Sequence, residues 1–158
     1  MVHLKPMTER EFQGYRQGAV EEYAQAHVKE GDWQPAEALQ KAEREFQQLL
    51  PNGVLSKNHY LFTIEDDQTH LKVGVIWFAV KGQAPPFSAF IYDFMIYEPH
   101  RKRGYGRQAL SALDEKAKES GIDTIELHVF GHNHAAIALY QKAGYEITHL
   151  QMAKKVSI

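Results

Sequence analysis

The sequence contains no cysteine among its 158 residues. This excludes disulfide bonds, cysteine-ligated zinc and a cysteine nucleophile, and it fits a reducing compartment. The sequence also lacks an apolar run of the roughly 20 residues that a membrane-spanning helix needs. Its first residues, MVHLKPMTEREF, carry no signal-peptide pattern. We therefore expect a cytoplasmic protein with no membrane partner.

Neither sign of charge dominates, because 18 basic residues are balanced by 20 acidic ones. The chain lacks the basic excess that is typical of nucleic-acid binding, so no nucleic-acid partner is expected. Positive charge is concentrated only at residues 101–107, and a nucleic-acid site there would predict steeply salt-dependent binding. Length and composition indicate one globular domain over residues 1–158. A homodimer is compatible with the sequence.

Hydrophobic periodicity predicts two leading helices. Thr8 and Glu11 form a capping-box pattern before a helix that ends near Gly31, and Pro35 begins a second helix. The later elements are predicted as strands over 59–66, 71–80 and 90–97, a helix over 104–120, a strand over 124–130, a helix from Asn133 to about 143, and a strand over 145–156. This order predicts an α/β fold with a mixed sheet, flanked by helices and containing one parallel crossover.

The stretch HRKRGYGRQAL, residues 100–110, joins a predicted strand to a predicted helix. A helix N-terminus offers unpaired N–H groups and a partial positive charge, which suit an anion. Glycine lets a diphosphate approach the backbone, and flanking Arg and Lys add charge-assisted hydrogen bonds. The stretch therefore suits a pyrophosphate. The alternative is that Gly104 and Gly106 only permit a tight turn and that the cations are solvated.

Gly104, Gly106 and Ala109 also match the loose dinucleotide fingerprint G-x-G-x-x-A. That fingerprint needs an acidic residue at the end of the next strand to bind the ribose. The next predicted strand ends in Phe130-Gly131 instead. An NAD(P)-dependent oxidoreductase is therefore the weaker alternative, and it predicts binding of NAD(P).

A second motif settles more, namely Asn133-x-x-Ala136-x-x-Leu139-Tyr140 followed by Gly144-Tyr145. Together with Arg101-x-x-Gly104-x-Gly106, it resembles the GNAT superfamily of N-acetyltransferases, and the resemblance covers essentially the whole chain. It implies an acyltransferase with a GNAT-type acyl-CoA N-acyltransferase fold. In that fold a mixed, mostly antiparallel sheet has splayed parallel central strands and is flanked by helices.

The resemblance also implies acetyl-CoA as the co-substrate, in a V-shaped gap between the strands at 89–97 and 124–130. The pantetheine arm would pair with the backbone of Met95, Ile96 and Tyr97. Asn133, Ala136 and Tyr140 would contact its other side. The pyrophosphate would lie on the basic turn formed by Arg101, Lys102, Arg103, Gly104, Tyr105, Gly106 and Arg107. The link YEPH before this turn is one residue shorter than the commonest family form. The residues at 95–97 that pair with the arm could therefore be shifted by one position along the strand.

The implied chemistry is direct transfer of the acetyl group to a primary amine in a ternary complex. The resemblance makes Tyr140 the general acid near the sulfur; the alternative is core packing. His128 lies where one branch of the family, which acetylates ribosomal protein N-termini, carries a glutamate, and it is a candidate base. It could equally be a hydrogen-bonded histidine at the edge of the cleft. Asp93, Glu126 or a chain of waters are alternative bases.

Several further assignments depend on weaker patterns. His128, His132 and His134 form H-x-x-x-H-x-H, but no acidic residue completes a set, so no metal site is predicted. The acidic residues of the leading helices either form a solvated face or attract a cationic amine: Glu21, Glu22, Glu30 and Asp32. A non-catalytic acyl-CoA-binding domain is the main alternative function. The acceptor stays open among protein N-termini, lysines, polyamines, amino acids and aminoglycosides.

Overall fold

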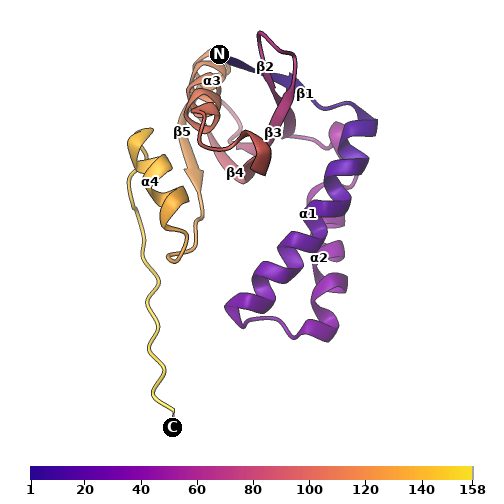
Figure 1. The fold of residues 1–158 in the computed structure, drawn as a ribbon, viewed down its shortest axis with the longest axis vertical. Coiled ribbons are helices and arrows are strands. Elements are labelled where there is room, and N and C mark those ends of the chain that lie inside the picture. Colours follow the sequence, from indigo (N-terminus) through magenta and orange to yellow (C-terminus); the bar gives the residue numbers. More distant parts are fainter. Residues whose placement is uncertain (158) are drawn as a thin grey trace. The chain divides into compact units, whose positions relative to one another are not determined.

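The computed structural model describes residues 1–157 (Figure 1). The chain divides into two compact units, the first spanning Met1–His128 and the second beginning at Val129. The first unit contains the sheet and three helices, and the described part of the second, residues 129–157, contains one helix. No helix within residues 1–157 has the length and apolar character needed to cross a membrane.

Within the described residues, five strands form one sheet in the order β1-β2-β3-β4-β5. Their bounds are Val2–Pro6, His59–Asp66, Lys72–Lys81, Phe87–Ile96 and Ile122–Leu127. The first three pairings are antiparallel, whereas β4 and β5 are parallel and are joined through a helix. The predicted GNAT-type fold class is confirmed, with the parallel pair at one edge of the described sheet.

The helices are α1 (Glu9–Glu30), α2 (Pro35–Leu49), α3 (Tyr105–Glu119) and α4 (His134–Lys142), with short 3₁₀ turns at Gly53–Leu55 and Glu98–His100. The capping box at the start of α1 is confirmed, since the Glu11 N–H donates to Thr8 Oγ1 and the Thr8 N–H donates to Glu11 Oε1. Lys72 and Thr63 also contact the Glu11 carboxylate. Burial opposes the shift, but these hydrogen bonds outweigh it and lower the pKa of Glu11 to about 2.

Helices α1 and α2 lie side by side and cover one face of the sheet (Figure 1). Phe12, Val20 and Phe46 pack there against Val75 and Trp77 of β3. Side chains alternate along a strand, so Phe62 and its neighbours face the other side, where α3 brings the Lys116 Nζ within 4.9 Å of the Phe62 ring centroid. Each such buried apolar side chain stabilises the fold by about 1.5–3 kcal/mol. The first unit is therefore a sheet between two helical layers.

One strand is missing from the sequence-based prediction, and one predicted strand is wrong. The alternation in Val2-His3-Leu4-Lys5 forms β1, which was not predicted. The strand predicted over 145–156 is not formed, because no described strand pairs with this segment and a strand needs the ladder hydrogen bonds of a neighbour. Leu150 and Met152 are accordingly exposed there.

Candidate functional site: a separated strand pair and an acidic pocket

The parallel strand β5 ends before its neighbour β4 does. Their pairing runs from Phe87 with Ile122 to Ile91 with Leu127, whereas β4 continues to Ile96. The last part of β4 therefore extends beyond the end of β5. Beyond Ile91, β4 has no described strand beside it on this side, and this is where the resemblance implies a gap between residues 89–97 and 124–130, although β5 itself ends at Leu127.

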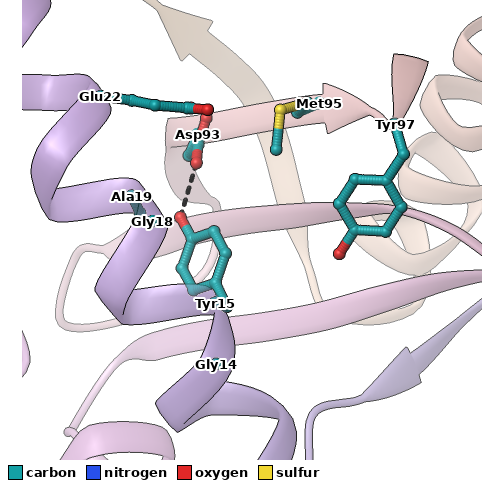
Figure 2. Close-up of a pocket in the computed structure, with 8 residues that line it drawn as sticks. All are labelled: Gly14, Tyr15, Gly18, Ala19, Glu22, Asp93, Met95 and Tyr97. Carbon is teal, nitrogen blue, oxygen red and sulfur yellow. Dashed lines mark hydrogen bonds between the residues drawn. The ribbon is translucent and has the colours of Figure 1, made fainter.

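A β-bulge changes which side chains of β4 face α1. Trp77 pairs with Asp93 and the next residue of β3 pairs with Ile91, so Tyr92 is an extra residue in β4. Bulges of this kind redirect the side chains that follow them. Tyr92, Met95 and Tyr97 all pack against the core beneath α1 and α2. The bulge thus places Asp93, Met95 and Tyr97 on the α1 face, as Figure 2 shows.

The register of β4 decides which of its backbone groups point away from β3, toward the edge of β4 that lies beyond the end of β5. The Tyr97 N–H donates to the Val73 carbonyl at 2.8 Å, and Met95 pairs with Val75. Because hydrogen-bonded pairs alternate in an antiparallel ladder, Met95 and Tyr97 direct their backbone groups to β3. Ile96 directs its own to the opposite side, where the Arg101 Nε donates to the Ile96 carbonyl at 2.7 Å. Of the three predicted strand contacts, Ile96 has the orientation that pairing with a ligand requires.

The basic turn precedes α3 in the predicted position. Arg101, Lys102 and Arg103 are exposed, and Gly104 caps the helix with φ of 83°. A Cβ on Gly104 would meet only the end of a flexible side chain, so this glycine is required for its left-handed conformation. The Gln108 N–H is the first to donate into the helix, to the Gly104 carbonyl at 3.1 Å. The N–H groups just before Gln108, of Tyr105, Gly106 and Arg107, therefore have no carbonyl partner within α3.

Tyr105 anchors this turn to the sheet. Its hydroxyl donates to Asp66 Oδ2 at 2.6 Å, and Asp66 Oδ1 accepts the backbone N–H groups of Gln68 and Thr69. The hydrogen bond from Tyr105 lowers the pKa of Asp66 and raises the pKa of Tyr105 itself. The Tyr105 side chain is thus committed to positioning α3, which leaves its backbone N–H for an anion.

The second motif lies on α4 of the second unit. Asn133 caps the helix, and its Oδ1 accepts the Ala136 N–H at 3.2 Å. Tyr140 is partly buried, and its ring lies edge-on to Tyr145 with 5.6 Å between centroids. In the first unit, His128 is exposed and follows β5 directly. The prediction that His128 lies within a strand is therefore wrong.

A pocket of about 210 Å³ lies between α1 and β4. Its lining, drawn in Figure 2, consists of Gly14, Tyr15, Gly18, Ala19, Glu22, Asp93, Met95 and Tyr97. The Tyr15 hydroxyl donates to Asp93 Oδ2 at 2.6 Å. Burial and then the Asp93 charge raise the pKa of Tyr15 well above its usual value. Burial also raises the pKa of Asp93; the Tyr15 hydrogen bond opposes this, and the charge of Glu22 adds to it.

The sequence indicated Glu22 as one of the acids that either form a solvated face or attract a cationic amine, and Asp93 as an alternative base, but it did not place them in one site. It gave Tyr15 no role in a site. A usable signal was the pair of glycines at positions 14 and 18, one helical turn apart inside α1. Glycine in a helix interior costs about 1 kcal/mol relative to alanine, so two on one face suggest a local requirement for space.

The fold, the separated strands and the basic turn define an acetyltransferase-type α/β protein, and comparisons with known proteins agree. A model of the acetyltransferase (GNAT) family matches residues 19–145. The chain therefore belongs to the GNAT family of acetyltransferases.

Two relatives from Bacillus subtilis (strain 168) match nearly the full length. The uncharacterized N-acetyltransferase YdgE is 40% identical over 97% of both chains, and the uncharacterized N-acetyltransferase YycN is 39% identical over 98% of this chain and 99% of its own. The crystal structure of YycN covers 100% of both chains with a TM-score of 0.93 and 38% identity. A Pyrococcus furiosus structure, 22% identical over 99% of this chain and 100% of its own, has a TM-score of 0.68 and shows the fold alone.

Proposed function

We propose that this acetyltransferase moves the acetyl group of acetyl-CoA to a primary amine in a direct ternary complex. The observation that carries the proposal is that β4 both continues beyond its pairing with β5 and has a lined pocket on its α1 face. A single strand can thus hold the arm of the co-substrate along its edge and an acceptor against its face.

Acetyl-CoA fits the groups that surround this stretch. The backbone of Ile96 faces the side on which the pantetheine arm is proposed to pair, whereas Met95 and Tyr97 direct their backbone groups to β3. Three exposed cations, Lys102, Arg103 and Arg107, complement a diphosphate at the start of α3. Arg101 braces the end of β4 through the Ile96 carbonyl. Asn133, Ala136 and Tyr140 of α4 are the proposed contacts on the other side of the arm.

The reaction breaks the thioester C–S bond and forms an amide C–N bond. The attacking ammonium must first lose a proton, for which His128 is the proposed acceptor. Tyr140 is the proposed acid that gives its proton to the departing thiolate. Asp93 is a poorer candidate base, because it is partly buried and already accepts a hydrogen bond from Tyr15.

Thermal unfolding with acetyl-CoA, CoA and NADH tests the co-substrate. A ligand that binds only the native state adds about 2.7 kcal/mol at a hundredfold excess over its Kd. We expect stabilisation by acetyl-CoA and CoA and none by NADH, followed by thiol release when amines are added. Stabilisation by NADH alone would replace the proposal with a dinucleotide site, and CoA binding without thiol release to any amine would indicate the non-catalytic alternative.

A further inference from the structure

The pocket between α1 and β4 carries charge of one sign only. Glu22 and Asp93 contribute two carboxyl groups, and none of the eight lining residues is basic. Lys72 is close enough to influence Tyr97, but its Nζ is paired with Glu11 Oε2 at 3.0 Å. The carboxyl groups of the pocket are therefore complementary to a cation that arrives with a ligand.

The charged and apolar parts of the lining are separated. Figure 2 shows Glu22 and Asp93 together at one end, Met95 along the middle and Tyr97 at the other end. Asp93 and Tyr97 are four positions apart on an extended chain, which corresponds to about 13 Å. An ammonium group suits the acidic end, and a methylene chain suits the wall formed by Met95 and Ala19.

Asp93, at the acidic end, is held in place by a hydrogen bond from α1. Tyr15 lies on α1, 78 positions from Asp93 in sequence, and its hydroxyl fixes one carboxylate oxygen at 2.6 Å. On the same helix, Gly14 and Gly18 leave space, since a Cβ on either would meet nothing within 4 Å. Core packing therefore does not demand glycine at these two positions, whereas an entering ligand would use the space.

We propose that this pocket selects an unbranched aliphatic amine that carries a second ammonium group, such as a diamine or the end of a polyamine. Glu22 and Asp93 hold the second ammonium group, and the reacting amine lies toward Tyr97. Glu22 is then a specificity residue and Tyr15 a positioning residue. This inference rests on the proposed acetyl transfer, and it disfavours acceptors that present a carboxylate to the acidic end.

Three four-carbon amines of different charge test the inference: putrescine, n-butylamine and γ-aminobutyrate. With the full-length protein and saturating acetyl-CoA, we expect kcat/KM for putrescine to exceed that for n-butylamine by about tenfold or more, and γ-aminobutyrate to be the poorest. Glu22→Gln should bring putrescine and n-butylamine to within about twofold of each other. Glu21→Gln changes the adjacent exposed glutamate, which does not line the pocket, and should keep the preference.

The possible outcomes distinguish a failure of the pocket assignment from a failure of the proposed acetyl transfer. Equal use of putrescine and n-butylamine by the unchanged protein, or a preference that survives Glu22→Gln, would overturn the pocket assignment while acetyl transfer stands. A peptide with one internal lysine that reacts faster than putrescine would assign the pocket to protein lysines instead. Failure of every amine together with no stabilisation by acetyl-CoA would overturn the transfer reaction itself, and the inference with it.

Discussion

The basic turn before α3 and the acidic pocket beneath α1 are built in opposite ways. The turn is a continuous segment, residues 101–107, in which exposed cations and backbone N–H groups are the proposed contacts of the diphosphate. The pocket joins a helix to a strand, and its central hydrogen bond links Tyr15 to Asp93 across 78 positions. A flexible diphosphate can be recognised by a local motif, whereas a small amine requires a shape that only the folded chain provides.

The two regions also differ in what their charges contribute to stability. Exposed charges such as those of Lys102 and Arg103 are screened by water and contribute little to the stability of the fold. Asp93 is partly buried, and burial raises its pKa, so its charged form depends on the hydrogen bond from Tyr15. Changes in the turn should therefore reduce co-substrate binding, while changes at Tyr15 or Asp93 should reduce both stability and amine use.

The largest effect is expected outside both regions, at Tyr140. Tyr140→Phe removes the proposed acid and should lower kcat by about a hundredfold or more, because general acid catalysis typically contributes that much. The thermal shift produced by CoA should be retained, since phenylalanine keeps the ring that is proposed to contact the pantetheine arm and removes only the hydroxyl. The rate of thiol release at saturating acetyl-CoA and amine measures kcat. An unchanged kcat would return Tyr140 to a packing role.

Tyr15→Phe should break the acidic end of the pocket. Loss of a hydrogen bond to a buried charged group costs about 1–3 kcal/mol, measurable by urea unfolding. The pKa of Asp93 is already raised above 3.8, so its contribution to stability falls as pH rises through the folded-state pKa. Removing Tyr15 raises that pKa further, and the deficit should therefore be larger at neutral pH than in acid.

Two comparisons control this experiment. Tyr60→Phe makes the same chemical change at a tyrosine of β2 that is 45% exposed, and it should leave stability nearly unchanged. Asp93→Asn combined with Tyr15→Phe should cost less than the sum of the two single changes, because the partners interact directly. Additive costs would mean that the hydrogen bond contributes little.

Gly104→Ala should weaken the basic turn. Alanine at φ of 83° costs about 1–2 kcal/mol, and the distorted turn should raise the KM for acetyl-CoA by about tenfold with no change in the KM for the amine. Gly31→Ala is the matched control, since Gly31 ends α1 at φ of 87° and lies outside the site. It should lose similar stability and keep both KM values. Equal effects of the two variants on KM would show that the turn acts only through stability.

The same contrast explains what the sequence could predict. Local signals sufficed for the Thr8 capping box, the β2–β3 hairpin and the turn at Gly104, because each is decided by neighbouring residues. The pocket was missed because neither the bulge at Tyr92 nor the partner of Tyr15 has a local signature. The strand expected over 145–156 was wrong for a related reason, since alternation predicts a strand only where a neighbouring strand is present to pair with it.

The smallest effect is expected for Gly18→Ala. The added methyl group should change protein stability and amine binding in opposite directions. Alanine is the better helix former and should raise the free energy of unfolding by about 0.5–1 kcal/mol, because a Cβ at position 18 meets nothing within 4 Å. The same methyl group takes space from the pocket and should raise the KM for putrescine about threefold, leaving the KM for acetyl-CoA unchanged. Gln17→Ala, on the exposed side of the same turn, should affect neither KM. If Gly18→Ala is more stable and its KM for putrescine is unaltered, this part of α1 does not contact the acceptor. If Gly18→Ala is more stable and its KM for putrescine is higher, glycine at this position keeps the pocket open at the expense of helix stability.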